Sequence, residues 1–280
     1  MSPAPADRSE GPALRADPRL ETLVARLRAA GCVFAEEEAR LLLDELGDLD
    51  REGFDERVRR REAGEPLEAV LGCVEFLGGR LAVVPGVFVP RRRTELLVRL
   101  AVERWRPGGV LVDLCTGVGA VPFGLLEASR PRDLGPLEIF AVDLDPLAVE
   151  TARRNVSARG VHLLTGDLDE PLPRELAGQV TVLTANAPYV PSAKIELMPR
   201  EARDFEPVLA LDGGVDGVEL HRRIAALAPR WLEPGGHLLI ETSERQAPLT
   251  AQAMLSAGLR PEVASDEELG ATVVVGCLPS

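Results

Sequence analysis

From residue 110 onward the chain alternates between short apolar runs and longer helical stretches, and this alternation constrains the fold more than any other feature. The runs typical of buried strands are residues 110–114, 137–142, 179–184, 237–241 and 272–275. Helical stretches, such as residues 146–159 and 218–231, lie between them. A helix that joins two parallel strands forms a right-handed crossover. The pattern therefore predicts an α/β fold with a largely parallel sheet and helices packed against it.

Residues 17–64 have the spacing of short helices. Asp17 and Pro18 are typical of a helix start, and the apolar residues that follow recur every three or four positions. Residues 34–46 repeat this pattern, and a third, more charged helix comes after them. We expect these helices to form a small bundle. Residues 65–90 instead mix Gly and Pro with Val, Leu and Phe, which is typical of a β-hairpin and connector.

The start of the chain is interpreted as a tail. Residues 1–12 are rich in Ala, Pro and Ser and have no apolar core, so they do not resemble a signal peptide. The expected organisation is a disordered tail (1–16), a helical domain (17–64), a hairpin linker (65–90) and a sheet domain (91–280).

Composition argues against several classes of partner. A formal net charge of −13 disfavours duplex nucleic acid, because a protein that binds many phosphates needs a cationic surface. The run Arg91, Arg92 and Arg93 is the one basic cluster that could be an exception. No apolar run approaches the ~20 residues that span a bilayer. The four cysteines form no C-x-x-C pair, which favours free thiols in a reducing cytoplasm over a disulfide framework or a metal site.

A glycine turn follows the first predicted strand of the sheet. Residues 113–120 read DLCTGVGA, with glycines at positions 117 and 119. Two glycines in a strand-to-helix turn allow the backbone to approach a ligand closely. On its own, a G-x-G turn also occurs in dinucleotide-binding proteins, in kinases and in ordinary turns.

Acidic residues at the ends of successive strands narrow the choice of ligand. Asp143 is placed to accept hydrogen bonds from two ribose hydroxyls, and Asp167 is a candidate acceptor for an adenine amino group. The turn lacks the third glycine of the dinucleotide motif. Asp113, just before the turn, would repel a diphosphate but attract an ammonium group. These features favour S-adenosylmethionine over NAD as the ligand.

A second motif, Asn186-Ala187-Pro188-Tyr189, follows the strand at 179–184. An Asn side chain can accept hydrogen bonds from an NH₂ group as well as donate them. With a neighbouring backbone carbonyl, it could hold a planar amide or amine against the tyrosine ring and aim its nitrogen at a methyl sulfonium. Positioning of this kind supplies much of the rate of such a displacement. No conventional general base is evident, and we interpret three histidines as structural: His162, His221 and His237.

Four segments together resemble a known family. Residues 186–189 resemble the N-P-P-Y motif of amino-methyltransferases, and residues 64–76 resemble a G-x-P-x-x-Y-I-x-G-x-x-E-F connector. Residues 88–95 (FVPRRRTE) resemble an L-I-P-R-P-E-T-E segment, and residues 205–217 resemble F-E-P-x-x-A-L-x-x-G-x-x-G. Taken in chain order, in a match that runs from about residue 17 to the end, the segments are similar to those of the HemK/PrmC family of protein glutamine-N5 methyltransferases.

The resemblance implies a fold, a donor and an acceptor. The implied fold is a Rossmann-like class I methyltransferase domain with a mostly parallel seven-stranded sheet, preceded by a small helical domain and a β-hairpin linker. The implied donor is S-adenosylmethionine, which leaves as S-adenosylhomocysteine. The implied acceptor is an exposed glutamine of a protein, in a Gly-Gly-Gln loop of a translation factor such as a release factor, or in a ribosomal protein.

Site residues are carried over by position. The donor site is expected to contain Asp113, Cys115, Thr116, Gly117, Gly119, Asp143, Leu144, Asp167, Leu168 and Asn186. The residues expected to be catalytic are Asn186, Pro188 and Tyr189. Those expected to contact the protein substrate are Phe88, Arg91, Glu95, Ala187, Phe205, Glu206 and Pro207.

The chain departs from the family pattern in three places. Ala187 replaces the first proline of N-P-P-Y, so the carbonyl is kept but the backbone is less restrained. Arg92 and Arg93 replace the P-E of R-P-E-T-E, which reverses a charge close to the donor site. Cys115 and Val118 stand where Gly and Ser or Thr are usual. We expect donor binding to survive these changes, which bear instead on the substrate.

Three other functions fit parts of the pattern. An N6-adenine methyltransferase could use the same motif for an adenine amino group, although the acidic composition and the lack of a basic, aromatic-rich region argue against it. A small-molecule methyltransferase could use the N-terminal lobe as a cap over its pocket. A non-catalytic S-adenosylmethionine-binding protein would have lost its acceptor site, and the presence of Asn186 and Tyr189 argues against such a loss.

Overall fold

The computed structural model of the protein describes residues 18–129, 137–156 and 161–280. The chain divides into two compact units, residues 1–71 and residues 72–280. The predicted tail, the predicted helix cap Asp17 and the end of the helix predicted over 146–159 lie outside the described residues. The division at residue 71 falls inside the range for which the sequence predicts a hairpin linker.

The first unit is built from short helices, which are α1 (Leu20–Ala29), α2 (Ala35–Leu46), α3 (Arg51–Glu62) and α4 (Leu67–Leu71). Apolar side chains at helical spacing, among them Leu27 and Leu42, are fully buried between these helices. Asp50 begins α3 by accepting a hydrogen bond from the amide of Gly53 at 2.8 Å. The amphipathic pattern in the sequence thus produces a small apolar core in this unit.

A β-hairpin opens the second unit, with strands β1 (Cys73–Phe76) and β2 (Gly79–Ala82) paired antiparallel. Asn155, on helix α7 (Pro146–Val156), attaches the hairpin to the rest of this unit. Its Oδ1 accepts from the amide of Ala82 at 2.7 Å, and its Nδ2 donates to the carbonyl of Val118 at 2.8 Å. One side chain therefore links the hairpin to the glycine turn.

The centre of the second unit is a seven-stranded sheet in the order β5-β4-β3-β6-β7-β9-β8. Its strands are β3 (Val110–Leu114), β4 (Glu138–Asp143), β5 (Val161–Thr165), β6 (Val180–Ala185), β7 (Leu232–Thr242), β8 (Arg260–Asp266) and β9 (Ala271–Cys277). The pairs from β5 to β7 are parallel, whereas β9 is antiparallel to both β7 and β8. The predicted α/β class with a mostly parallel seven-stranded sheet is confirmed.

The apolar runs in the sequence leave out two strands, β5 and β8. Each lies at an edge of the sheet and pairs with one neighbour, β5 with β4 and β8 with β9, and both consist mostly of exposed and partly buried residues. An edge strand needs few buried side chains, so its sequence carries little apolar signal.

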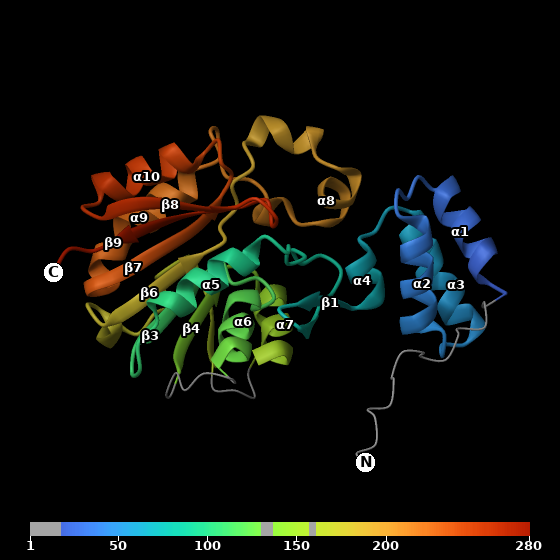
Figure 1. Cartoon of the computed structure of the whole chain (residues 1–280), viewed down its shortest axis with the longest axis horizontal. Coiled ribbons are helices and arrows are strands. Elements are labelled where there is room, and N and C mark those ends of the chain that lie inside the picture. The colour runs from blue at the N-terminus through green and yellow to red at the C-terminus, as the bar shows by residue number, and fades with distance from the viewer. Residues whose placement is uncertain (1–17, 130–136, 157–160) are drawn as a thin grey trace, which may run out of the picture. The chain divides into compact units, whose positions relative to one another are not determined.

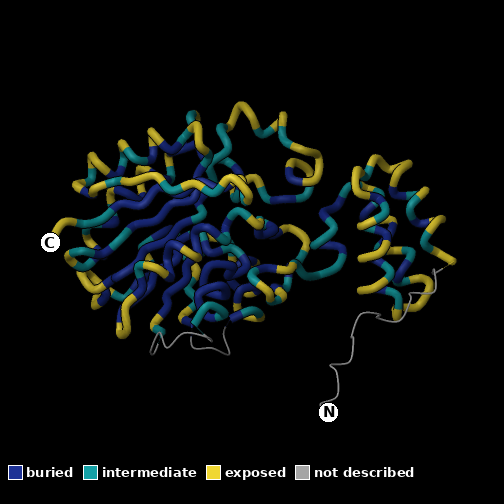
Figure 2. The backbone as a smooth tube through the Cα atoms, in the orientation of Figure 1, coloured by how far each residue is buried: buried dark blue, intermediate teal, exposed yellow. Residues whose placement is uncertain are grey.

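Helices cover both faces of the sheet (Figure 1). Helices α5 (Thr94–Arg104), α6 (Ala120–Ser129) and α7 pack on one face, and α9 (Glu219–Trp231) and α10 (Ala247–Ser256) pack on the other. The side chains of successive residues of β3 point to opposite faces of the sheet. Leu111 packs with the first group of helices and Val112 with the second. The central strands are therefore buried along their length (Figure 2). Among the described residues, no helix has both the length and the apolar content that crossing a bilayer requires.

The order of the strands reverses next to β3, which lies between β4 on one side and β6 on the other. In open α/β sheets, ligands bind beyond the carboxyl ends of the strands at such a point. The remaining short helices lie around β6. Helix η2 (Arg174–Leu176) precedes it, and the segment between β6 and α9 contains η3 (Ser192–Leu197), α8 (Arg200–Phe205) and η4 (Val208–Ala210). We therefore expect the ligand site at the carboxyl ends of β3, β4 and β6.

Candidate active site

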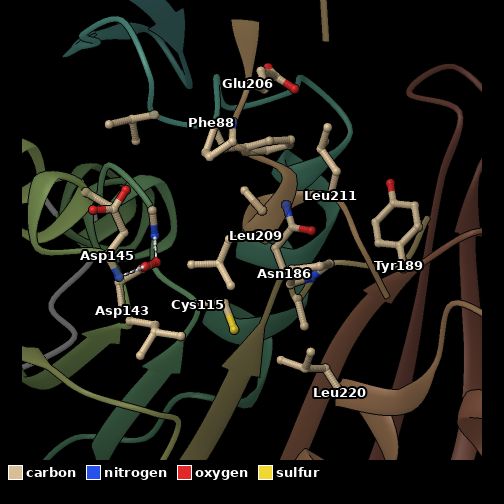
Figure 3. A pocket seen from close by; sticks show the side chains of 18 of the residues that line it. Phe88, Cys115, Asp143, Asp145, Asn186, Tyr189, Glu206, Leu209, Leu211 and Leu220 are labelled. Carbon is tan, nitrogen blue, oxygen red and sulfur yellow. Dashed lines mark hydrogen bonds between the residues drawn. The ribbon is translucent and has the colours of Figure 1, made fainter. Parts of the chain in front are cut away.

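A cavity opens at the carboxyl ends of β3, β4 and β6, within the second unit. The predicted site residues that line it are Phe88, Arg91, Cys115, Gly117, Asp143, Leu144, Asp167, Leu168, Asn186, Ala187, Pro188, Tyr189, Glu206 and Pro207. The predicted site residues that do not line it are Glu95, Asp113, Thr116, Gly119 and Phe205. Figure 3 shows Asp143 and Asp145 on one side of the cavity and Asn186 and Tyr189 on the other. We call these two sides the donor end and the acceptor end.

The two glycines of the turn have different roles at the donor end. Gly117 lines the cavity with φ +55°, and a Cβ added to it would meet no heavy atom within 4 Å. Gly119, with φ +82°, faces the other way, and a Cβ there would lie 3.2 Å from the Cβ of Ala152 on α7. Gly117 therefore leaves space for a ligand beside the backbone, while Gly119 allows the helices to pack closely.

Two other residues of the cavity wall hold an uncommon backbone conformation. Cys115 has φ +57° and Leu168 has φ +49°, in the left-handed region that glycine adopts without strain. Glycine, which the family pattern that the chain resembles has at the position of Cys115, would adopt this conformation without strain. Burial raises the pKa of the Cys115 thiol, so the side chain stays protonated and does not act as a nucleophile. Backbone strain thus gathers at the donor end, as it often does at functional sites.

Asp143, at the end of β4, is held by backbone amides. Its Oδ2 accepts a hydrogen bond from the amide of Gly117 at 2.7 Å, and its Oδ1 accepts one from the amide of Asp145 at 2.9 Å (Figure 3). Burial raises the pKa of Asp143, and these amide hydrogen bonds oppose that rise. Each carboxylate oxygen has a second lone pair, so Asp143 can also accept from ligand hydroxyls in the cavity.

Asp113 lies behind the donor turn, one of the least exposed polar residues in the second unit. Its Oδ1 accepts a hydrogen bond from the hydroxyl of Thr184 on β6 at 2.7 Å. Burial raises the pKa of this carboxyl to about 7, although hydrogen bonds to hydroxyl groups oppose the rise. Because Asp113 does not line the cavity, the predicted contact with an ammonium group stays a prediction.

Asp167 contributes a charged pair to the donor end. Its Oδ2 accepts from the guanidinium of Arg223, on α9, at 2.8 Å, and both residues line the cavity. Nothing in the sequence pattern indicates Arg223, because it comes from a helix far along the chain. The pair is partly exposed to solvent, with side chains 55% and 37% accessible, so the interaction is weak and its partners can rearrange.

Asn186 is the central residue of the acceptor end. It directly follows β6 and lines the cavity together with Ala187, Pro188 and Tyr189. Its Nδ2 donates a hydrogen bond to the hydroxyl oxygen of Thr94, the first residue of α5, at 3.2 Å. Thr94 is buried and was not predicted as a site residue.

The loop at 186–189 rests on the glycine-rich stretch that follows it. The amide of Val190 donates to the carbonyl of Leu211 at 2.9 Å, and the amide of Gly213 donates to the carbonyl of Val190 at 2.8 Å. A Cβ added to Gly213 would lie 2.7 Å from the Cα of Tyr189 and 2.8 Å from the carbonyl oxygen of Pro188. Only glycine leaves room here, which gives the F-E-P…G-x-x-G resemblance a physical basis.

Two arginines line the acceptor end, and each is paired with a buried glutamate. Arg91 donates to Glu206 at 2.5 Å and lies 5.2 Å from the centre of the Phe88 ring. Arg93 donates through Nε to Glu241 of β7 at 3.2 Å and lies 5.7 Å from the centre of the Tyr189 ring. Neither Arg93 nor Glu241 was predicted as a site residue, although the sequence shows Arg93 as a departure from the family motif.

His221 lies on α9 behind the acceptor loop and is fully buried. Its Nδ1 is 2.8 Å from the hydroxyl oxygen of Thr250, and its ring centre is 6.5 Å from that of Tyr189. Burial lowers the pKa of His221 to about 4, so the ring is neutral near pH 7. Because it does not line the cavity, His221 supports the loop rather than serving as a base at the reacting atoms.

Comparison with known proteins identifies the family. No family model matches the chain. A release factor glutamine methyltransferase of Mycolicibacterium smegmatis is 35% identical over 266 residues, which cover 89% of this chain and 92% of that protein. The chain belongs to the release factor glutamine methyltransferase family. A further member, from Streptomyces coelicolor, is 40% identical over 211 residues, which cover 72% of this chain and 73% of that protein.

A solved structure shows a similar fold. A methyltransferase of Pyrococcus furiosus superposes with a TM-score of 0.53 at 17% identity, covering 81% of this chain and 98% of that one. The predicted family resemblance and the predicted enzyme class are therefore confirmed, and so is the predicted methyltransferase fold.

Proposed function

We propose that this member of the release factor glutamine methyltransferase family transfers the methyl group of S-adenosylmethionine to the side-chain amide nitrogen of a glutamine in a protein. The observation that carries the proposal is the shared cavity. Asp143 and Gly117 line its donor end, and Asn186, with its Nδ2 committed to Thr94, lines its acceptor end. One cavity can therefore hold a nucleoside donor and an amide acceptor side by side.

The donor end fits S-adenosylmethionine. Gly117 leaves open space against the backbone, and Asp143 lines the cavity, where we propose that the second lone pair of each carboxylate oxygen accepts from a ribose hydroxyl. When bound there, S-adenosylmethionine supplies an electrophilic methyl group on a positively charged sulfur. Leu144, Leu168 and Cys115 would then cover the apolar faces of the nucleoside. A neutral thiol at Cys115 is compatible with this role, since the side chain is not consumed by the reaction.

The acceptor end fits a planar amide. The Oδ1 of Asn186 and the carbonyl oxygen of Ala187 are proposed to accept the two N–H groups of the glutamine amide. These hydrogen bonds keep electron density on the nitrogen and fix its lone pair toward the donor. The Tyr189 ring would bound one side of the amide. Burial raises the pKa of Tyr189 to about 12, so its hydroxyl stays neutral at physiological pH.

The proposed substrate is a translation factor. The curated relatives carry the name release factor glutamine methyltransferase, so we propose a release factor with an exposed glutamine as the first substrate to test. A ribosomal protein is the second. Both act in translation, so we propose the cytoplasm as the place of reaction. The net charge of −13 makes a nucleic acid a poor substrate.

The test is a methylation assay with a purified release factor and methyl-labelled S-adenosylmethionine, followed by mass spectrometry. We expect one glutamine side chain to be labelled. Asn186→Ala should slow transfer by about 100-fold or more, because the amide loses its alignment. Donor affinity, measured by calorimetry, should remain unchanged in this variant.

Two controls define the result. A release factor in which the labelled glutamine is replaced by alanine should accept no label. A ribosomal extract offered in parallel separates the two protein substrates. Label that appears only in nucleic acid would overturn the proposed substrate class, and an Asn186→Ala enzyme of normal rate would remove the proposed role of the amide.

A further inference from the structure

The order of the strands indicates where the base of a bound donor lies. Asp143 ends β4, Asn186 follows β6, and β3 lies between these strands, with β5 on the far side of β4. Asp143 and Asn186 are on opposite sides of the cavity (Figure 3). A nucleoside carries its base and its sulfur at opposite ends of the ribose. With the ribose at Asp143 and the methyl group facing Asn186, the base therefore lies at the end of β5.

Asp167 is the side chain that the chain places there. Asp143 and Thr165 are partners in the sheet, and the amide of Gly166 donates to the carbonyl of Asp143 at 3.0 Å. Asp167 is the next residue and lines the cavity. Its carboxylate therefore borders the space that the base of the donor would occupy.

Arg223 comes to the same place from α9. Its Nη2 donates to Asp167 Oδ2 at 2.8 Å, and both residues line the cavity. A second contact holds α9 against this loop, because Trp231 Nε1 donates to Asp169 Oδ2 at 2.9 Å and Trp231 is almost fully buried. The position of Arg223 therefore depends on the packing of α9 as well as on Asp167.

A carboxylate beside a guanidinium is complementary to one kind of base. The carboxylate of Asp167 accepts hydrogen bonds, whereas the guanidinium of Arg223 only donates them. Adenine presents the reverse, an amino group that donates next to a ring nitrogen that accepts. Hypoxanthine has an oxygen in place of the amino group, and this oxygen would face the carboxylate with no proton between them. The pair therefore matches adenine and opposes hypoxanthine.

We propose that Arg223 is a specificity-determining residue of the donor site, because its guanidinium donates to a ring nitrogen of adenine while Asp167 accepts from the neighbouring amino group. The guanidinium has several N–H groups, and its bond to Asp167 uses one of them. The inference rests on the proposed function, since it requires S-adenosylmethionine at the donor end.

The first test measures the binding of S-adenosylhomocysteine, which has the base of the donor, and of S-inosylhomocysteine, which has hypoxanthine instead. We expect calorimetry on the purified protein to show that the inosine compound binds about 10-fold to 100-fold more weakly. In Asp167→Asn the side-chain amide can donate to an oxygen as well as accept, so the two affinities should lie within about threefold of each other. Equal binding of both compounds by the wild type would overturn the match to adenine.

A second set of compounds tests Arg223 itself. In the 1-deaza and 7-deaza forms of S-adenosylhomocysteine, a CH group replaces the ring nitrogen on one or the other side of the amino group. We expect one of these two forms to bind to the wild type about tenfold more weakly than the parent compound. Arg223→Met cannot donate, so it should bind the parent compound about tenfold more weakly and bind all three compounds alike.

Two results in this set would contradict the role of Arg223. Wild-type protein that binds both deaza forms as tightly as the parent compound makes no hydrogen bond to either ring nitrogen. A penalty for one deaza form that persists in Arg223→Met would mean that another group of the protein contacts that nitrogen.

Arg222, the neighbouring residue on α9, provides a matched control. It donates to a carboxylate of similar exposure, that of Asp216, at 2.5 Å, but it does not line the cavity. Arg222→Met should bind the parent compound and both deaza forms as the wild type does. An equal loss of affinity in Arg222→Met and Arg223→Met would mean that the substitutions disturb α9, and would contradict a contact between Arg223 and the base.

The binding measurements and the methylation assay can fail separately. If S-adenosylhomocysteine does not bind to the wild type, the proposed donor and the role of Arg223 are both wrong. If it binds with the expected preferences while no glutamine is methylated, the proposed acceptor is wrong and Arg223 keeps its role. If glutamine is methylated but the wild type and Arg223→Met respond alike to the deaza forms, only the role of Arg223 fails.

Discussion

The donor and acceptor ends of the cavity are held by different kinds of interaction. At the donor end, Asp143 is fixed by the backbone amides of Gly117 and Asp145, which lie 26 and two residues away in the chain. At the acceptor end, side chains hold one another across far longer separations. These pairs are Arg91 with Glu206 (115 residues), Arg93 with Glu241 (148 residues) and Thr94 with Asn186 (92 residues).

The difference shows which part of the enzyme is free to vary. Backbone amides are present whatever the side chain, so the donor end depends on the path of the chain and on a few glycines and acids. The acceptor end depends on the identity of both partners in each pair. A glutamate that is almost fully buried needs its arginine, because an unpaired buried charge is costly. We therefore expect donor binding to tolerate changes that abolish acceptor alignment, and the reverse.

The largest effect that separates the two ends is expected from Asp143→Ala. The variant loses both amide hydrogen bonds and the proposed ribose contact, so affinity for S-adenosylmethionine should fall about tenfold or more, for a loss of ~1.5–3 kcal/mol. Calorimetric titration of the purified protein measures this affinity directly. The side-chain pairs of the acceptor end are untouched, so release factor binding should change little.

A carboxylate that supports the acceptor loop serves as the control for Asp143. Asp212 accepts from the amide of Gly214 at 2.9 Å and from the hydroxyl of Ser192 at 2.6 Å, without lining the cavity. Asp212→Ala should leave donor affinity unchanged. Equal donor affinity in Asp143→Ala and the wild type would remove the ribose assignment.

The donor end could be predicted from the sequence because its parts are local. An apolar strand, a glycine turn and an acid at the next strand end form a short pattern, and parallel strands bring their carboxyl ends to one edge of a sheet. Asp143, Gly117 and Asn186 all line one cavity as this reasoning predicts. The family motifs added Arg91 and Glu206, which the fold does bring together.

The acceptor end could be predicted only in part, because its pairs depend on the register of distant segments. Nothing local indicates that Glu241, in an apolar strand, faces Arg93. Neighbouring residues of a helix also point in different directions, which the motif does not reveal. Thr94 contacts Asn186, while the side chain of Glu95, about 100° further around α5, does not line the cavity. Phe205 ends α8 and is likewise not a lining residue, whereas Glu206, in extended backbone, is.

A smaller effect, confined to the acceptor end, is expected from Gly213→Ala. The added Cβ would lie within 2.8 Å of the Pro188 carbonyl oxygen and the Tyr189 Cα, so the acceptor loop must shift. We expect a fivefold to tenfold drop in kcat, about 1 kcal/mol, with donor affinity unchanged. Steady-state kinetics with the release factor would measure the drop.

Gly236→Ala is the matched control, because it introduces the same crowding elsewhere. A Cβ at Gly236 would lie 2.8 Å from the carbonyl oxygen of Val180, where β6 begins, far along the strand from Asn186. Both alanine variants should lose stability, but only Gly213→Ala should lose turnover at temperatures where both are folded. A proportional loss in both would mean that crowding acts through stability and not through the acceptor loop.

The smallest effect concerns Asp113, which lies behind the donor end. Burial raises the pKa of its carboxyl to about 7. The folded protein therefore binds this proton more tightly than the unfolded chain, so stability falls as the pH rises from about 4 to 7 and stays lower above that. Asp113→Asn carries no charge at any pH and escapes this loss. Between about pH 5 and pH 6, its stability relative to the wild type should increase by ~1 kcal/mol, measured by thermal unfolding.

Asp266 supplies a carboxyl with the opposite behaviour. A hydrogen bond from Arg99 lowers the pKa of Asp266, so its titration is complete below the range tested. Asp266→Asn should therefore show no drift in relative stability over the same pH range. If Asp113→Asn also shows none, Asp113 is ionised in the folded protein at every pH tested. Asp113 would then be a fixed negative charge behind the turn that can attract the ammonium group of the donor. In that case the donor end would depend on a buried charge, just as the acceptor end depends on Glu241.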